Sequence, residues 1–360
     1  MSRFGEQSVG VAIVGCGYWG INYVRVLNEI PESRVIAVCD KREERLQEVA
    51  RRAPGVFLTS DLESILQSDE IEAVAVCTEA SSHFKIASQC LRAGKHVLVE
   101  KPITVLVEDA EELARIADNN DVKLMVGHTF LYNAGIAKVK ECLDQRCDRI
   151  YYVHASRTNL GPIRRDVNAV WDLATHDIAI FNHLLRGVPN WVNAVGAKVL
   201  RNCREDVAFV CLGYDDGVLG HIHVSWADPN KSREIVVVCS ERRIVFNDLN
   251  AIEPVRIYEK GVMPLGEEPL TFGEYQLKIR DGDIVSPRIE PNEPLKTECR
   301  HFLECVMHNL PPATSARDGI NVLRTLEAID RSIKARGATV EVEKHECYSH
   351  SYAGTAGSVA

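Results

Sequence analysis

The first third of the chain alternates short apolar runs with amphipathic segments. Apolar runs of strand length occupy residues 9–14, 34–39, 71–77, 96–99 and 122–126. Segments with helical spacing fill the intervals, at residues 18–29, 41–52, 83–93 and 107–119. Strands that alternate with helices over short connections are typical of βαβ units. The pattern predicts an α/β fold whose N-terminal domain, residues 1–126, is a doubly wound parallel sheet of Rossmann type.

The pattern changes after residue 126. One helical segment at 134–145 precedes strand-like runs at 149–157, 193–200, 207–214, 218–226, 235–239, 244–247 and 255–258. Helical spacing returns at 171–185, 296–307 and 318–335, and Asp215-Asp216-Gly217 has the composition of a hairpin turn. We therefore expect an α+β domain with a mainly antiparallel sheet at 127–343, an irregular loop at 261–294, and a disordered polar tail at 344–360.

Composition removes several classes of function. The chain has 360 residues and a formal net charge of −9, so it lacks the basic balance that favours nucleic acid. No apolar run approaches the roughly 20 residues of a membrane span, and the first residues lack the apolar segment of a secretory signal. The 12 cysteines are scattered singly, without the spacing of a zinc site. We expect reduced thiols, no metal and a cytoplasmic protein.

A glycine motif follows the first apolar run. Residues 15–20 read Gly-Cys-Gly-Tyr-Trp-Gly, a complete G-x-G-x-x-G that opens a helix. Gly15 permits the tight turn, Gly17 lets the backbone approach a pyrophosphate, and Gly20 allows the helix to pack closely on the strand. Glycine turns are common, but Asp40 ends the next strand and can bind ribose hydroxyls there. The sequence predicts an NAD site, although Lys41 and Arg42 leave NADP open.

Two further constellations could carry chemistry. Lys101 directly follows the strand-like run His96–Glu100, at the edge where open α/β sheets bind ligands. An isolated lysine, however, is usually a solvated surface charge. Asp172 and His176 stand four residues apart on the segment 171–185, opposite an apolar stripe. Spacing alone allows a plain solvated helix face at these two positions.

These motifs carry a resemblance to a known family. The GCGYWG turn, the run HFKIASQCLRAGKHVLVEKP and the motif Asp172-Leu-Ala-Thr-His176-Asp177 resemble the Gfo/Idh/MocA oxidoreductases. The resemblance implies a Rossmann domain joined to an open antiparallel sheet, homodimers or homotetramers, and a lysine and a histidine at the substrate. Ala174 stands where many members have glycine. The cofactor site is then expected to comprise Gly15, Gly17, Tyr18, Trp19, Gly20, Asp40, Thr78, His83, Glu100 and Lys101.

The resemblance also predicts the roles of three catalytic residues, Lys101, Asp172 and His176. His176 is the expected general base, because its unperturbed pKa lies near operating pH. Asp172 would orient the imidazole, and Lys101 would bind the substrate oxygen and stabilise alkoxide charge. Lys101 with a lowered pKa could instead be the base.

The stretch NLGPIRRDVNAVWDLATHDI looks like the branch of nucleotide-sugar 3-dehydrogenases, such as those acting on UDP-N-acetylglucosamine. Arginine recognises phosphate or carboxylate, although loop arginines are often only surface charges. Expected substrate contacts are Lys101, Tyr132, Asn133, Arg157, Asn159, Arg164, Arg165 and His176. The hypothesis is oxidation of a secondary hydroxyl of a nucleotide-activated sugar. The alternatives are an inositol or free-sugar dehydrogenase, an NADPH-dependent ketosugar reductase, and a non-catalytic NAD(H) sensor.

Overall fold

A computed structural model describes residues 8–343, apart from 147, 162, 165, 201–202 and 264–277. The expected tail at 344–360 and Arg165 therefore lie outside the described residues. In the part described, no helix is both long and apolar enough to span a membrane, and the ten cysteines there are free. The same ranges hold no cluster of side chains suited to a metal ion.

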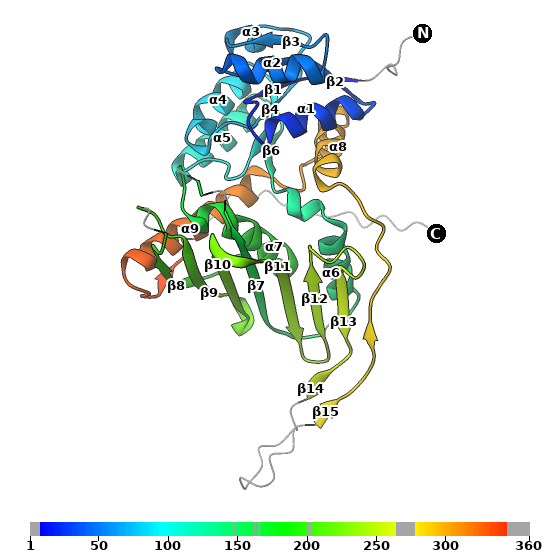
Figure 1. The fold of residues 1–360 in the computed structure, drawn as a ribbon, viewed down its shortest axis with the longest axis vertical. Coiled ribbons are helices and arrows are strands. Elements are labelled where there is room, and N and C mark those ends of the chain that lie inside the picture. Colours follow the sequence, from blue (N-terminus) through cyan, green and yellow to red (C-terminus); the bar gives the residue numbers. More distant parts are fainter. Residues whose placement is uncertain are drawn as a thin grey trace.

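The N-terminal third of the chain, at the top of Figure 1, contains a parallel six-stranded sheet. Its strand order is β3-β2-β1-β4-β5-β6. Its strands are β1 (Val9–Val14), β2 (Ser33–Cys39), β3 (Phe57–Thr59), β4 (Ala73–Val76), β5 (His96–Glu100) and β6 (Leu124–Gly127). Helices α1 (Gly20–Glu29), α2 (Glu43–Arg52), α3 (Glu63–Leu66), α4 (Ala80–Arg92) and α5 (Val107–Asn119) connect them. The order reverses between β1 and β4, which creates the crevice where such sheets bind nucleotides. The predicted Rossmann domain is confirmed.

The second sheet has nine strands in the order β16-β13-β12-β11-β7-β10-β9-β8-β17. They are β7 (Ile150–Leu160), β8 (Trp191–Ala197), β9 (Val207–Gly213), β10 (Leu219–Ser225), β11 (Ala227–Cys239), β12 (Arg243–Asn247), β13 (Val255–Tyr258), β16 (Ile284–Val285) and β17 (Val340–Glu341). Neighbours are antiparallel except β7 and β10, and the hairpin predicted at Asp215-Asp216-Gly217 joins β9 to β10. The predicted mainly antiparallel sheet is confirmed.

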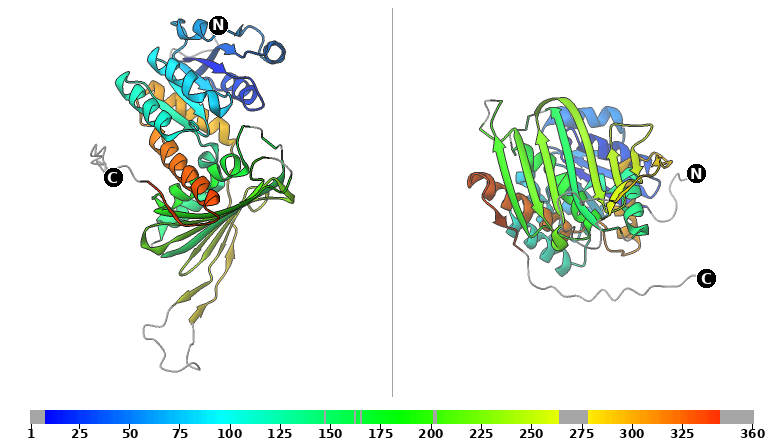
Figure 2. Two further views of the ribbon diagram at one scale, coloured as in Figure 1. Left: turned by 90° about the vertical axis from the view of Figure 1, so that its left-hand side faces the viewer. Right: turned by 90° about the horizontal axis from the view of Figure 1, so that it is seen from below.

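Helices cover one face of this sheet. They are α6 (Ala134–Gln145), the π-helix η2 (Val170–Ala174) with α7 (Thr175–Leu185), and α9 (Ala316–Lys334). Figure 2 shows the other face of the sheet without helices over it. The predicted loop at 261–294 contains two short strands of a ribbon, β14 (Gly261–Met263) and β15 (Lys278–Arg280), and it also contains β16.

Helix α8 (Pro294–Met307) packs differently from the sequence prediction, which placed all of 127–343 in the second domain. Its apolar face, with Leu295, Cys299, Phe302 and Leu303, joins the core formed by α1 and β1. The chain thus returns to the Rossmann half because this stripe completes the apolar cover of that sheet.

Candidate active site

The glycine turn has the geometry of a dinucleotide cradle. Gly15 has a φ of +92°, and a Cβ at Gly20 would lie 1.9 Å from the Gly15 carbonyl oxygen, so protein packing demands both glycines. A Cβ at Gly17 would meet nothing closer than the Arg42 guanidinium at 3.9 Å. Gly17 is therefore dispensable for packing, which fits a residue whose bare backbone serves an approaching pyrophosphate.

Asp40 lies at the end of β2, beside this turn. Its carboxylate accepts hydrogen bonds from the backbone N–H of Cys16 at 2.6 Å and of Arg42 at 2.9 Å. Burial alone would raise the pKa of Asp40, but these bonds and the Arg42 guanidinium lower it below its usual value. Asp40 is thus a fixed negative charge at the end of the second strand, and an acidic residue there disfavours a 2′-phosphate in Rossmann domains.

The other expected cofactor residues differ in their surroundings. Tyr18 and Trp19 are exposed at the turn, and the methyl group of Thr78 lies over Gly15. Both ring nitrogens of buried His83 face backbone carbonyls, Nδ1 that of Pro102 at 2.8 Å and Nε2 that of Thr78 at 3.1 Å. His83 therefore braces the loops after β4 and β5, and it offers a cofactor no free nitrogen.

Lys101 links the two halves of the molecule. Its Nζ donates to the backbone carbonyl of Asp172 at 2.9 Å and lies 3.4 Å from Asp172 Oδ1. Its backbone N–H donates to Glu100 Oε2 at 3.1 Å, so Glu100 supports Lys101 from the sheet side. Burial lowers the pKa of Lys101, and the Asp172 carboxylate opposes that shift. The structure thus brings together two of the three predicted catalytic residues.

Asp172 makes its hydrogen bonds with groups other than the His176 imidazole, contrary to its expected role of orienting that ring. Its Oδ1 accepts from Arg164 Nη1 at 3.2 Å, and its Oδ2 accepts from Trp226 Nε1 at 3.3 Å. Asp172 lies in the π-helix η2, whose wider turn breaks the alignment of side chains four residues apart. Its contacts make it a partner of Lys101, and we correct its expected role accordingly.

His176 packs against an aromatic ring beside a cation. Its imidazole lies 4.8 Å from the ring of Phe130, and the Arg157 guanidinium covers the same ring at 4.3 Å. Burial lowers the pKa of His176 well below its usual value, and the charges of Lys101 and Arg157 lower it further. His176 is therefore neutral near pH 7, and the same burial and cations disfavour the imidazolium that would form if it accepted a proton.

The arginines predicted to meet an anionic substrate are paired within the protein. Arg157 donates from Nε and Nη2 to Asp177 at 2.8–3.1 Å, with both side chains buried. Arg164 contacts Asp166 and Asp172, with 28% of its side chain exposed. Arg157 was predicted to contact substrate, but its guanidinium is held in a buried ion pair with Asp177. Arg164 remains partly accessible to solvent.

The three other predicted substrate contacts are Tyr132, Asn133 and Asn159, and only some of their side chains are satisfied by hydrogen bonds within the protein. Tyr132 lies 3.1 Å from the Thr314 hydroxyl, and Asn133 caps α6 while donating to Asp248 at 3.1 Å, so these side chains hold local structure. Asn159 Oδ1 is buried and has no hydrogen-bond partner in the described part of the chain. Asn159 is thus the one of these three side chains with an acceptor that no described residue satisfies.

Sequence reasoning missed the residues that hold the site together. Phe130 and Trp226 contact His176 and Asp172, while Tyr23 and Glu298 lie behind Glu100. His128 is buried with two ring nitrogens that have no partner among described residues. His128 and Phe130 follow directly after β6, at the ligand-binding edge, and that position was the available signal.

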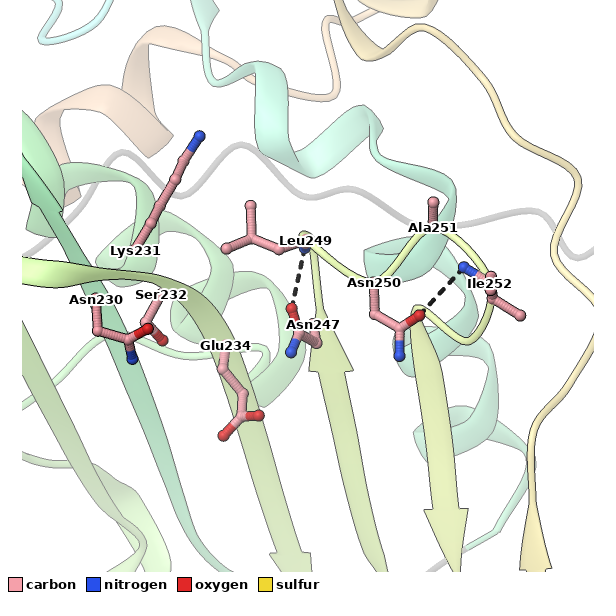
Figure 3. Close-up of a pocket in the computed structure, with 9 residues that line it drawn as sticks. All are labelled: Asn230, Lys231, Ser232, Glu234, Asn247, Leu249, Asn250, Ala251 and Ile252. Atoms are coloured by element: carbon pink, nitrogen blue, oxygen red, sulfur yellow. Dashed lines mark hydrogen bonds between the residues drawn. The ribbon is translucent and has the colours of Figure 1, made fainter.

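A cavity of about 670 Å³ lies on the second domain, between β11 and the loop that joins β12 to β13 (Figure 3). Residues lining it include Asn230, Lys231, Glu234, Asn247 and Asn250. Arg233 also lies on β11, where its guanidinium binds Asp248 at 3.2 Å and lies 5.9 Å from the Phe130 ring. Because successive side chains of a strand point to opposite faces, Glu234 faces away from Phe130, and the cavity is separate from the site beside His176.

Comparison with known proteins agrees with this geometry. The family model described as an oxidoreductase family with an NAD-binding Rossmann fold matches residues 9–128, and the Gfo/Idh/MocA C-terminal domain model matches 138–245. D-apiose dehydrogenase of Paraburkholderia graminis is 24% identical over 93% of this chain and 90% of its own length. UDP-N-acetylglucosamine 3-dehydrogenase of Acidithiobacillus ferrooxidans is 26% identical, over 90% and 96%. The solved structure of GenD2 from gentamicin A biosynthesis, in complex with NAD, superposes with a TM-score of 0.80 at 26% identity, over 96% and 99%. The chain belongs to the Gfo/Idh/MocA family of NAD-dependent oxidoreductases.

Proposed function

We propose that this protein oxidises a secondary hydroxyl group of a sugar to a ketone. The observation that carries the proposal is the 2.9 Å contact between Lys101 Nζ, at the end of β5, and the Asp172 carbonyl on the substrate side. The glycine turn and Asp40 would hold the dinucleotide, and NAD supplies the hydride acceptor when bound. Lys101 would donate a hydrogen bond to the substrate oxygen and stabilise negative charge on it.

His176 would take the hydroxyl proton. Burial keeps the imidazole neutral, so that one ring nitrogen is unprotonated and can take the proton while the carbinol hydrogen leaves as hydride. Burial and the nearby cations also make this imidazole a weak base. Phe130 packs against the imidazole, and the Arg157 guanidinium covers the Phe130 ring in turn. Ketone reduction would use the same groups in reverse.

The proposed substrate is a nucleotide-activated sugar. The 26% identity over 90% of this chain to the UDP-N-acetylglucosamine enzyme supports it, and partly exposed Arg164 leaves a cation for a phosphate. A second candidate is an uncharged sugar or polyol, because Arg157 and Arg164 already contact aspartates. The name of the D-apiose dehydrogenase relative specifies a sugar and mentions no nucleotide.

The substrate test follows NADH formation by ultraviolet absorbance. The enzyme is given NAD⁺ with UDP-N-acetylglucosamine, its uronate, free N-acetylglucosamine, apiose and inositols. We expect turnover with a UDP-sugar and none with the matching free sugar. Equal turnover of the two would reject the nucleotide-sugar assignment, and silence across the panel would favour an NAD(H) sensor.

Lysine substitutions test the catalytic assignment. Lys95 is a matched control for Lys101: both are 9% exposed, and the Nζ of Lys95 donates to a backbone carbonyl at 2.8 Å, remote from the site. We expect Lys101→Met to lower kcat by about a hundredfold or more with NAD⁺ affinity kept, and Lys95→Met to affect stability only. His176→Asn should lose kcat in the same way. Near-normal kcat in both Lys101→Met and His176→Asn would overturn the assignment.

We also propose a homodimer or homotetramer that uses the uncovered face of the second sheet. The strand registers place the exposed side chains of Tyr152, Val195, Phe209 and Leu219 together on one face. Second copies of the same sheet would cover this face. Light scattering should give a multiple of the 40.1 kDa chain mass. Phe209→Glu should shift it to the monomer mass, and a wild-type monomer would exclude the proposal.

A further inference from the structure

A buried row of polar groups lies behind Lys101, on the side away from Asp172. The Tyr23 hydroxyl lies 2.9 Å from Glu100 Oε1 and 3.3 Å from Glu298 Oε2. Thr129 donates to the same Glu298 oxygen at 2.9 Å, and the other oxygen of Glu100 accepts the Lys101 N–H at 3.1 Å. The row joins α1, β5, η1 (Thr129–Tyr132) and α8 to the loop that carries Lys101.

The hydrogens available do not satisfy two ionised carboxylates. Tyr23 has one hydroxyl hydrogen, and it can be donated to Glu100 or to Glu298 but not to both. If both groups were ionised, one carboxylate oxygen would face the lone pairs of the tyrosine oxygen. A protonated Glu298 removes the conflict, because it donates to Tyr23 while Tyr23 donates to Glu100.

A second observation points to the same proton. Glu298 is 0% exposed, and its Oε1 has no hydrogen-bond partner among the described residues. An ionised carboxylate with a buried, unsatisfied oxygen is far more costly than a neutral acid in the same place. The two carboxyl groups also come within about 6 Å of each other across the Tyr23 hydroxyl, where like charges repel strongly.

We propose that Glu298 is a positioning residue that carries a proton, so that the Glu100–Tyr23–Glu298 row places one negative charge, on Glu100, behind the Lys101 ammonium. Glu100 is then the member of the pair that stays ionised, because it lies beside Lys101 whereas Glu298 lies one hydroxyl further away. The arrangement helps Lys101 to keep its proton inside an apolar setting. The effect of this arrangement on catalysis by Lys101 rests on the proposed dehydrogenase function, whereas the protonation state of Glu298 does not depend on that function.

Other charged and titratable groups near the row agree with this assignment. Burial raises the pKa of Glu298 well above its usual range, and the Glu100 carboxylate raises it further. Burial raises the pKa of Glu100 also, but the Lys101 and Arg164 cations oppose that change. Other titratable groups that interact with the row are the thiols of Cys77 and Cys299 and the Tyr132 hydroxyl, whose pKa values burial raises.

Infrared spectroscopy of the full-length protein tests the proton directly. The spectrum of wild type minus Glu298→Gln near neutral pH should contain the carbonyl stretch of a protonated carboxyl group. Glu63→Gln, at an exposed position on α3, is the control and should leave that band in place. Absence of the band from the Glu298→Gln difference would overturn the proposal, whether or not any sugar is oxidised.

The effect on Lys101 is measured by NMR titration of isotope-labelled lysines, with Lys101→Met to assign the signal. Glu100→Gln removes a negative charge and should lower the pKa of Lys101 by about one unit or more. Glu298→Gln and Glu298→Met replace a neutral group by neutral groups and should leave that pKa unchanged. A shift in the Glu298 variants as large as that in Glu100→Gln would mean that Glu298 is ionised, and it would overturn the proposal.

Discussion

Replacement of Arg157 by methionine should destabilise the fold more than it weakens substrate binding. The Arg157 and Asp177 side chains are 6% and 1% exposed, and three hydrogen bonds of 2.8–3.1 Å join them. Arg157→Met would leave the Asp177 carboxylate buried without its cation. Breaking a buried ion pair from one side costs about 3–5 kcal/mol.

This cost corresponds to a measurable change in melting temperature. Unfolding entropy is about 2.1 cal/mol/K per residue, so a chain of 360 residues loses about 1.3–1.5 °C for each kcal/mol. We expect Arg157→Met to melt about 4–7 °C below wild type in a circular dichroism scan. Removal of both charges in Arg157→Met/Asp177→Leu should recover most of the loss, because no uncompensated charge remains.

An exposed pair provides the control for this measurement. The Arg288 and Glu290 side chains are 89% and 85% exposed, so Arg288→Met should leave the melting temperature within about 1 °C. If Arg157→Met melted with wild type and raised only the KM of a UDP-sugar, the guanidinium would bind substrate. The structural interpretation of the buried pair would then be refuted.

Three further predictions concern stability and cofactor choice. Burial lowers the pKa of His128 to about 4, whereas an unfolded histidine titrates near 6.5. The stability that the neutral ring contributes is present above pH 6.5, and about 3 kcal/mol of it is lost as the pH falls toward 4. In urea titrations, the free energy of unfolding of His128→Phe should therefore fall less with decreasing pH than that of wild type. Gly17→Ala should keep the wild-type melting temperature but weaken NAD⁺ binding about tenfold or more in calorimetry. Gly20→Ala places a Cβ 1.9 Å from the Gly15 carbonyl oxygen and should lower the melting temperature. Equal melting temperatures of the two variants would contradict this prediction. Asp40→Asn should narrow the preference for NAD⁺ over NADP⁺ in paired binding measurements, and an unchanged ratio would remove Asp40 as its cause.

The regular hydrophobic pattern made most of the fold predictable. Strand β13 was predicted with its observed bounds, and the Rossmann alternation is present as expected. Strand β3 was missed because it is three residues long and only partly buried at the sheet edge. The first half of β11 was missed because its sequence, ADPNKSRE, is polar and partly exposed, so no alternation marks it. The pairing of α8 with α1 depends on contacts across the whole chain, which periodicity does not encode.

The site was predictable in its parts but not in its contacts. Motif positions at strand ends were enough to bring the glycine turn, Asp40 and Lys101 to one edge of the sheet. The direction of Asp172 was not predictable, because the π-turn that rotates it depends on tertiary packing as well as on sequence. The pairing of Arg157 was also hidden, since Asp177 was considered only as part of a motif and not as a buried carboxylate in need of a cation.

Residues from distant parts of the chain surround the Lys101 ammonium group on two sides. On the sheet side, Glu100 accepts a hydrogen bond from Tyr23, and the Tyr23 hydroxyl also contacts Glu298 of α8, a helix that begins at Pro294. On the substrate side, the Asp172 carbonyl accepts from Nζ, and Arg164 and Trp226 hold its carboxylate. An ammonium group in this apolar setting needs negative charge on both sides, because burial alone would favour the free amine. These charges come from both domains, because Glu100 lies in the Rossmann sheet and Asp172 in the second domain. The protonation state of Lys101 therefore depends on how the two domains pack together.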